Sequence, residues 1–211
     1  MIKNGILISL EGIDGSGKST LAQNLFECIS RKFSTILTKE PGATALGQKI
    51  RTIVQEKNVP LCAKAEYFLF AADRAQHFDE IVLPSLAAHN IVISDRMADS
   101  SLVYQGFGRG LDSNTIFSIN QWAMNNRQPD LTFYVKVPIE VALERLKIRN
   151  QELTSFEKED ISFMERVSNG FEKIFKDKNH VITLDGQESP EILAQQATAI
   201  VEQWLSAKKR L

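Results

Sequence analysis

The sequence predicts an α/β protein of three layers, in which helices cover both faces of a five-stranded parallel sheet. Short apolar runs alternate along the chain with longer segments whose apolar residues recur at helical spacing. The apolar runs are continuous, which is typical of parallel strands that are buried on both sides. The length of 211 residues suits a single domain, and neither a linker nor an internal repeat divides residues 1–211.

The strands are expected at these apolar runs, in order. The first, residues 6–11, begins Ile-Leu-Ile-Ser-Leu, and a second short run, Thr-Ile-Leu-Thr, covers residues 35–38. The remaining runs are Asn-Ile-Val-Ile-Ser at 90–94, Leu-Thr-Phe-Tyr-Val at 131–135 and Val-Ile-Thr-Leu at 181–184. Because a helical pattern lies between most successive runs, the strands are predicted to be parallel.

Helices are expected between the strands and after the last one. In the first helix, Leu21, Leu25 and Ile29 recur at helical spacing. Pro84 is expected to bend or end the third helix, because proline lacks the backbone donor that a helix interior needs. The expected helices span residues 19–33, 45–56, 63–83, 113–125, 139–149, 157–175 and 190–207.

Composition and charge limit the function classes. A net charge of −1 gives no electrostatic reason to expect a long nucleic acid or an anionic membrane as partner. No apolar run approaches the roughly 20 residues of a membrane span, and the first strand occupies the N-terminus, so we expect a cytoplasmic protein. Cys28 and Cys62 are expected to be buried free thiols, because neither belongs to a C-x-x-C pair. His77, His89 and His180 have no partner that the sequence reveals.

Residues 12–19, Gly-Ile-Asp-Gly-Ser-Gly-Lys-Ser, fit the phosphate-binding pattern G-x-x-x-x-G-K-S/T at every fixed position. The segment follows the first strand and opens a helix, which is the setting in which this pattern binds phosphate. Glycines let backbone N–H groups point at phosphate oxygens, while the helix N-terminus and Lys18 add positive charge. A glycine-rich turn without function is the plainer alternative, but it does not explain the lysine and the serine. We therefore predict that the chain binds a nucleoside triphosphate.

The same segment supplies most of the candidate ATP contacts. Lys18 is also a candidate catalytic residue, and the hydroxyl of Ser19 is a candidate ligand of Mg²⁺. The ATP-binding candidates here are Gly12, Ile13, Asp14, Gly15, Ser16, Gly17, Lys18, Ser19 and Thr20.

Asp95 and Arg96 follow the third strand, at the edge of the sheet where ligands of such folds gather. An aspartate there can orient Mg²⁺ or its water shell, so Asp95 is the second candidate metal ligand. The arginine beside it can clamp a second phosphate. A simple ion pair at the strand end is the alternative. A GTPase switch is disfavoured, because no asparagine in the chain precedes a lysine and the guanine-specific motif N-K-x-D is therefore absent.

Further stretches in a fixed order accompany these motifs. They are residues 38–44 (Thr-Lys-Glu-Pro-Gly-Ala-Thr), 70–74 (Phe-Ala-Ala-Asp-Arg), 95–106, 108–111 (Gly-Arg-Gly-Leu) and 129–132 (Pro-Asp-Leu-Thr). With residues 11–19 they resemble bacterial thymidylate kinase over nearly the whole chain. The resemblance implies a P-loop nucleoside triphosphate hydrolase fold, and transfer of the γ-phosphoryl group of ATP to dTMP with Mg²⁺ as cofactor, in dTTP biosynthesis. It also implies a homodimer, built on helices such as 63–83 and 113–125; that the apolar faces of these helices cover the sheet instead is the alternative.

The resemblance implies roles for single residues. In proteins that this chain resembles, the phenylalanine matching Phe70 stacks on thymine and the arginine matching Arg74 bonds its O4 atom. The residue matching Ser101 meets the base near N3, and the tyrosine matching Tyr104 packs against the sugar. Packing roles for Phe70 and Tyr104 remain as alternatives. The implied dTMP-binding residues are Asp14, Glu40, Arg51, Phe70, Arg74, Arg96, Ser100, Ser101, Tyr104 and Gln105.

Arg96 and Arg51 match arginines that hold the acceptor phosphate, and Arg96 is a candidate catalytic residue; a solvated surface role is the alternative for Arg51. A monophosphate acceptor also suits the chain on chemical grounds. Its second pKa is about 6, so the attacking oxygen is largely ionised at neutral pH and needs no general base. The catalytic problem is then to align two anions, which requires several converging cations. A kinase acting on a hydroxyl would instead need a carboxylate or histidine as base.

A further basic segment, Arg-Leu-Lys-Ile-Arg at 145–149, places Arg145 and Arg149 on one helix face, because they are four residues apart. Thymidylate kinases without an arginine in the phosphate loop supply one from a lid. The resemblance therefore implies a lid at about 145–160, with Arg149 as the catalytic arginine and Arg145 as an ATP contact. A solvated helix face is the alternative. Which arginine meets the phosphates stays open, because residues 153–157, Leu-Thr-Ser-Phe-Glu, replace the second lid arginine that the family often has.

Three alternative functions remain open at this point. They are a kinase of another nucleoside monophosphate or of a deoxynucleoside, a nucleotide-gated ATPase, and a non-catalytic nucleotide-binding module. The intact Lys18 and Asp95-Arg96 weigh against the binding module. A panel of acceptors in an ADP-release assay separates all of these.

Overall fold

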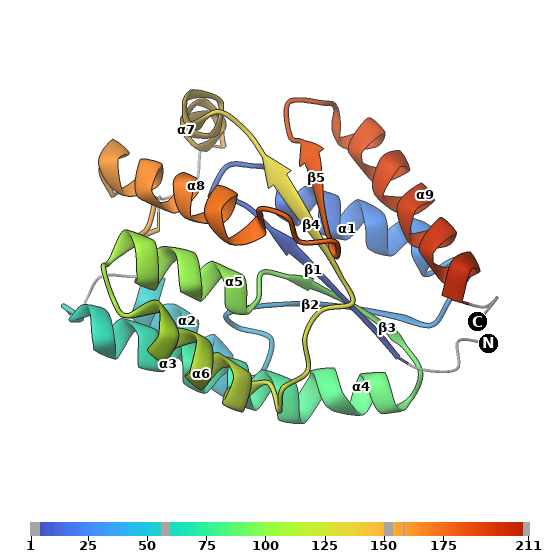
Figure 1. Ribbon diagram of the computed structural model, residues 1–211, viewed down its shortest axis with the longest axis horizontal. Helices are drawn as coiled ribbons and strands as arrows, with labels where there is room; N and C mark the ends of the chain where they lie inside the picture. The colour runs from blue at the N-terminus through green and yellow to red at the C-terminus, as the bar shows by residue number, and fades with distance from the viewer. Residues whose placement is uncertain (1–4, 56–59, 150–153, 158, 209–211) are drawn as a thin grey trace.

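Within the residues that the computed structural model describes, 5–55, 60–149, 154–157 and 159–208, five strands form one parallel sheet (Figure 1). The strand order is β2-β3-β1-β4-β5, so the first strand lies at the centre. The strands are β1 (Ile6–Glu11), β2 (Thr35–Lys39), β3 (Ile91–Asp95), β4 (Leu131–Lys136) and β5 (Val181–Asp185). Each bound lies within one residue of the expected one, which confirms the predicted sheet.

Helices fill the connections, and all seven expected helices are present. They are α1 (Lys18–Ile29), α2 (Ala45–Gln55), α3 (Ala63–His77), the π-helical turn η1 (Phe78–Val82), α4 (Leu83–Ala87), α5 (Ala98–Ser101), the π-helical segment η2 (Leu102–Gly108), α6 (Ser113–Ala123), α7 (Ile139–Ile148), α8 (Ile161–Phe175) and α9 (Pro190–Lys208). Residue 56, the expected end of the second helix, lies outside the described residues. The expected start at residue 157 is wrong: α8 begins after Asp160, whose side chain accepts the N–H of Phe163 at 2.7 Å and caps the helix.

Two further differences concern helix ends. The helical conformation that begins with α3 does not end at Pro84, because η1 and α4 continue it without a break. There Pro84 occupies the first turn, where no intrahelical donor is needed. Residues 98–108 form a helical segment that the sequence did not predict. Its glycines weaken the helical signal, and Gly108 is required by packing, since a Cβ there would lie 2.6 Å from Cε2 of Phe163.

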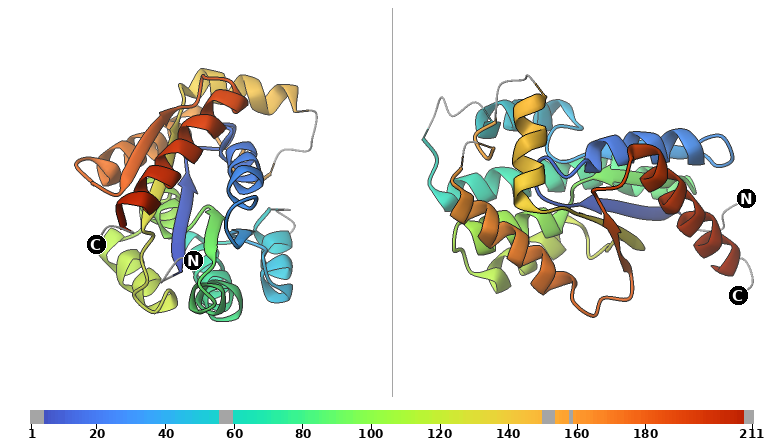
Figure 2. Two further views of the ribbon diagram at one scale, coloured as in Figure 1. Left: turned by 90° about the vertical axis from the view of Figure 1, so that its right-hand side faces the viewer. Right: turned by 90° about the horizontal axis from the view of Figure 1, so that it is seen from above.

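β1 shows why helices cover both faces of the sheet. Its six residues are all buried, and their side chains alternate between two cores. Ile8 and Leu10 pack with α1 and α9, whereas Leu7 packs with Phe78 and Val82 of η1. Figures 1 and 2 show α1 and α9 on one side of the sheet and α5 and α8 on the other. The predicted three layers are therefore confirmed.

The register of the sheet brings three loops to one edge. Leu10 of β1 and Lys39 of β2 both pair with Asp95 of β3. Because the strands are parallel, the phosphate loop, the segment after Lys39 and the segment after Asp95 leave the same edge side by side. This edge is the one at which ligands bind in folds of this class.

The cysteines differ from expectation. Both are free, but Cys62 is exposed at the position that precedes α3, and Cys28 is half-buried on α1. The expectation of buried thiols is wrong because these positions do not face either core. Among the helices in the described part of the chain, none has the length and apolar character needed to cross a membrane.

Candidate active site

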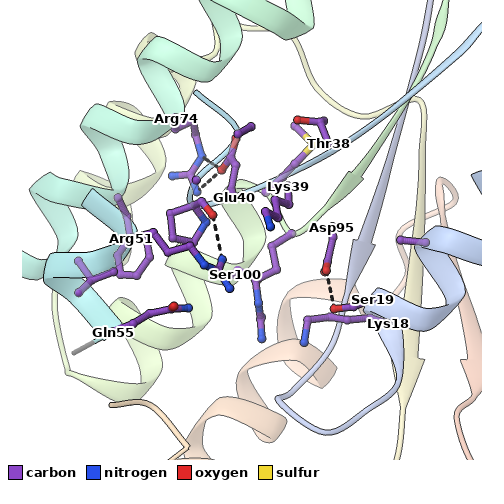
Figure 3. A pocket seen from close by; sticks show the side chains of 18 of the residues that line it. Lys18, Ser19, Thr38, Lys39, Glu40, Arg51, Gln55, Arg74, Asp95 and Ser100 are labelled. Atoms are coloured by element: carbon purple, nitrogen blue, oxygen red, sulfur yellow. Dashed lines mark hydrogen bonds and ion pairs between the residues drawn. The ribbon is translucent and has the colours of Figure 1, made fainter. Parts of the chain in front are cut away.

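A cavity of about 950 Å³ opens at this edge of the sheet. In Figure 3, Lys18 and Asp95 stand at one end and Glu40 and Arg74 at the other. The predicted site residues that line it are Asp14, Lys18, Ser19, Glu40, Arg51, Phe70, Arg74, Asp95, Arg96, Ser100, Ser101, Tyr104, Gln105 and Arg149. The predicted residues outside the lining are Gly12, Ile13, Gly15, Ser16, Gly17, Thr20 and Arg145. Residues far apart in the chain thus meet around one space, which is large for a ligand pocket.

The phosphate loop has the backbone that its glycines allow. Gly15 and Gly17 have φ of +81° and +95°, in the left-handed region that favours glycine. A Cβ on Gly15 would lie 2.4 Å from the carbonyl oxygen of Ala142, so a larger residue does not fit. Lys18 is buried, and its Nζ donates to the carbonyl of Ile13 at 3.2 Å. Burial and the charge of Arg96 lower the pKa of Lys18.

Ser19 and Asp95 meet beside the loop, as the two metal candidates should. The Ser19 hydroxyl donates to Oδ2 of Asp95 at 2.5 Å. Oδ1 of Asp95 is buried without a hydrogen-bond partner among the described residues. A hydroxyl and a carboxylate oxygen are ligands that Mg²⁺ takes, directly or through water. The residues present therefore fit this ion.

Arg96, Asp14 and Tyr104 line the cavity and form a hydrogen-bonded cluster beside Lys18. Arg96 Nη2 donates to Oδ1 of Asp14, and the Tyr104 hydroxyl donates to Oδ2 at 2.9 Å. Burial raises the pKa of Asp14, but the charges of Arg96 and Lys18 outweigh it and hold the pKa at about 2. Asp14 is therefore ionised at neutral pH.

The backbone of Arg96 is strained, with φ of +72°, a conformation often found at functional sites. Glu11 fixes the segment that follows. Its Oε1 accepts the N–H of Met97 at 2.8 Å, and its Oε2 accepts the hydroxyl of Ser100 at 2.6 Å. Ser100 Oγ in turn accepts from Nη1 of Arg96 at 3.0 Å. Glu11 was not predicted as a site residue, although it lies in the motif that includes the phosphate loop.

The far end of the cavity is formed by α3 and η2. Phe70 lies against Phe156, with ring centroids 5.8 Å apart, and the ring of Tyr104 lies 5.9 Å from the same phenylalanine. Gln105 donates to Glu66 at 3.0 Å. Phe156 was missed as a lining residue, because nothing in its local sequence shows that it reaches the site.

Arg74 is almost wholly buried, with 1% of its surface exposed. Nη1 donates to Oδ1 of Asn120 at 2.7 Å and Nη2 to the hydroxyl of Ser101 at 3.1 Å. Glu40 accepts from Nε of Arg74 at 2.9 Å, and its Oε2 forms an ion pair with Nη2 at 2.8 Å. Asn120 comes from α6 and was not predicted, since no pattern near it in sequence points to the site.

The remaining predicted arginines, Arg51, Arg145 and Arg149, differ in what they contact. Arg51 donates from Nη1 to the carbonyl of Pro41 at 2.9 Å and lines the cavity. Arg149 lies just beyond α7, also lines the cavity and pairs with Glu157 at 3.0 Å. Arg145 instead donates to the carbonyl of Ser16 at 3.2 Å, so it touches the phosphate loop from outside. Of the expected lid, residues 150–153 and 158 lie outside the described residues.

The strand, loop and helix around Lys18, with cations converging on the same cavity, place the chain among the P-loop nucleotide-binding proteins. Comparison with known proteins narrows this class. The sequence model of the family described as thymidylate kinase matches residues 10–197. The chain is 38% identical over 190 residues to the thymidylate kinase of Halothermothrix orenii, covering 89% of this chain and 91% of that protein. It is 38% identical over 203 residues to that of Thermosipho africanus (96% and 100% covered). It is 41% identical over 188 residues to that of Carboxydothermus hydrogenoformans (89% and 92%). The chain belongs to the thymidylate kinase family.

Proposed function

We propose that this protein transfers the γ-phosphoryl group of ATP to dTMP, giving dTDP and ADP in the synthesis of dTTP. The observation that carries the proposal is that one cavity joins the phosphate loop to a second end. Lys18 and Asp95 stand at the first end and Arg74 and Glu40 at the other (Figure 3), and Phe70 and Arg96 also line the cavity. The cavity therefore has a place for each of two nucleotides, and its cations suit the space where their phosphates would meet.

The end of the cavity at Arg74 suits a pyrimidine with carbonyl groups. Arg74 offers donors only, which match a carbonyl oxygen such as O4 of thymine. We propose that Phe70 supplies the face on which the base stacks and that Ser101 meets its edge. Tyr104 is fixed by Asp14 and would lie against the sugar, where it favours deoxyribose.

The chemistry requires no general base, because a monophosphate is already largely ionised at neutral pH. Arg96 lies next to the phosphate loop, so we propose that it holds the acceptor phosphate together with Arg51. Lys18 then neutralises charge on the transferred group. Mg²⁺, held by Ser19 and Asp95 with the ATP phosphates, supplies further neutralisation when it is bound.

An ADP-release assay with a panel of acceptors tests this function. We expect kcat/KM for dTMP to exceed that for dCMP or thymidine by at least about a hundredfold, because a site built to bond a particular group rejects analogues lacking it. Removal of Mg²⁺ with a chelator should abolish turnover. ADP release that does not depend on any acceptor would show an ATPase instead. Binding of ATP without turnover would show a non-catalytic module.

We also propose that residues 1–211 act as one nucleotide-kinase domain and that the chain belongs to the class of its family with the catalytic arginine in the lid. The phosphate loop supports this class, since residues 12–19 contain no arginine. Arg149 supports it too, because it lines the same cavity as Lys18. The substrates ATP and dTMP are consistent with action in the cytoplasm.

A homodimer is the last part of the proposal. Five of the eight exposed large apolar side chains among the described residues lie on the adjoining helices α2, α3 and α6: they are Leu46, Ile53, Phe68, Phe117 and Trp122. An exposed apolar group of this extent is typical of an interface. A dimer in which two copies of the protein meet through α2, α3 and α6 would cover these apolar side chains.

Changing Phe117 to aspartate should convert the dimer to a monomer, because it would place a charge in the apolar centre of this face. Light scattering after size-exclusion chromatography measures the mass. Ile192→Asp on α9 is the matched control, since Ile192 is also exposed but lies on another side of the molecule. An unchanged dimer in the Phe117 variant would exclude this interface.

A further inference from the structure

A chain of buried polar groups runs from β2 to Arg74 behind the far end of the cavity. The Thr38 hydroxyl lies 2.7 Å from Nε2 of His77, and Nδ1 of His77 lies 2.9 Å from Oε1 of Glu40. Oε2 of Glu40 accepts from Nε of Arg74 at 2.9 Å. None of the four side chains is more than 8% exposed. The sequence did not reveal these partners of His77, because they lie 37 and 39 residues away along the polypeptide.

This row of hydrogen-bonded side chains determines which N–H groups of Arg74 are left to bind a ligand. A guanidinium has five N–H groups. Hydrogen bonds to Glu40, Asn120 and Ser101 take three of those of Arg74, one from each nitrogen, and Nη2 also forms an ion pair with Glu40. Among the described residues, the second N–H of Nη1 has no such acceptor. Arg74 also lines the cavity, so its orientation decides where this remaining donor points.

His77 holds Glu40 from the side opposite Arg74. Burial raises the pKa of Glu40, but the charge of Arg74 and the hydrogen bond from His77 outweigh it and lower the pKa. Glu40 is therefore an ionised carboxylate that only accepts, and we assign the imidazole proton to Nδ1 from this contact. Nε2 then accepts the Thr38 hydroxyl. Each of these groups acts as a defined donor or acceptor to its neighbour, so the carboxylate of Glu40 cannot turn without losing a buried hydrogen bond.

We propose that His77 is a positioning residue for recognition of the acceptor base, and that Thr38 fixes it. Through Glu40, His77 holds the guanidinium of Arg74 so that its free N–H meets a base carbonyl. A 4-amino pyrimidine presents an N–H donor where thymine presents a carbonyl oxygen. The amino group and the N–H of Arg74 then face each other without an acceptor, and an arginine whose orientation is fixed cannot turn away. Discrimination between 4-carbonyl and 4-amino bases thus depends on a residue that does not line the cavity. This inference rests on the proposed use of dTMP.

Four variants test the proposal. His77→Leu removes both imidazole contacts, whereas His77→Asn keeps an amide N–H near the position of Nδ1. Thr38→Val removes only the hydroxyl. Thr132→Val is the matched control, because Thr132 is also a buried strand threonine and bonds Ser9 at 2.8 Å within the sheet. For each variant, KM for dTMP, KM for ATP, kcat and the inhibition constant of dCMP against dTMP are measured, with thermal unfolding as the check on folding.

In His77→Leu we expect KM for dTMP to rise roughly tenfold. The ratio of the dCMP inhibition constant to the KM for dTMP should fall by about the same factor. Changes of this size are expected when one hydrogen bond to a charged group is weakened. kcat and KM for ATP should stay within about twofold. Thr38→Val should shift both quantities in the same direction by less, His77→Asn should restore most of the loss, and Thr132→Val should change neither.

Several outcomes overturn the proposal. They are an unchanged ratio in a folded His77→Leu, equal losses in His77→Leu and His77→Asn, or an equal fall in kcat and in the affinity for ATP, which marks a general structural role. Should His77→Leu fail to fold, Thr38→Val decides the question. A Thr38→Val enzyme with the wild-type KM for dTMP and the wild-type inhibition constant of dCMP would reject the proposed positioning role. A wild-type enzyme that does not phosphorylate dTMP would refute the proposed function instead, so the two failures are distinguishable.

Discussion

Replacing Lys18 with methionine is expected to lower kcat for dTMP phosphorylation by about 10²–10³, the range seen when a preorganised electrostatic group is removed from a transition state. Lys18 is buried beside the phosphate loop, 3.7 Å from Oδ1 of Asp14 and at the end of the cavity assigned to ATP. Methionine keeps the length and the apolar stem but loses the charge. The fall should appear in kcat as well as in KM for ATP, since the charge on the moving group is neutralised chiefly in the transition state. Steady-state assays at saturating Mg²⁺ and ATP measure it.

Lys32→Met provides the matched control. Lys32 lies just after α1, is exposed and pairs with Glu202 at 2.5 Å, far from the cavity. We expect wild-type kinetics, because an exposed ion pair contributes about 1 kcal/mol or less to stability. A Lys18→Met enzyme that turns over at the wild-type rate would contradict the assignment of the γ-phosphoryl group to this loop.

The sheet could be predicted from sequence because burial on both faces makes each strand a continuous apolar run. Ile8 and Leu7 point to opposite cores, so polarity cannot alternate there. Helix ends were less predictable. The passage of the chain through η1 depends on packing of Phe78 and Val82 beneath the sheet, and a proline alone does not reveal it.

The site could be predicted as far as its motifs are local. The phosphate loop and Asp95-Arg96 are contiguous, and the parallel order of the strands brings them together. Asn120 and His77 could not be found in this way, because each contacts Arg74 or Glu40 through the fold. Both are buried polar groups, and their partners are known only once the helices are placed.

The chain has two arginines near the end of α7, and the structure distinguishes their surroundings. Arg149 lines the cavity and is held by Glu157, which is 8% exposed and also accepts the N–H of Thr154 at 2.7 Å. Arg145 bonds the carbonyl of Ser16 and is not among the residues that line the cavity. A guanidinium that lines the cavity can contact the transferred group, whereas one that bonds the backbone of the loop can support its shape. This difference favours Arg149 as the catalytic arginine.

Arg149→Ala should therefore lower kcat by about 10³ or more, the contribution of an arginine that stabilises the transition state of phosphoryl transfer. KM for dTMP should change little, because the contact matters chiefly in the transition state. Arg145→Ala should cause a smaller loss that also weakens ATP binding, and Lys147→Ala, an exposed change on the same helix, should cause none. Single-turnover rates with saturating ATP and dTMP separate these effects from product release. Unchanged turnover in Arg149→Ala would reject the assignment. A loss confined to Arg145→Ala would transfer the catalytic role to Arg145, since each variant removes one guanidinium, from α7 or from the residue that follows it.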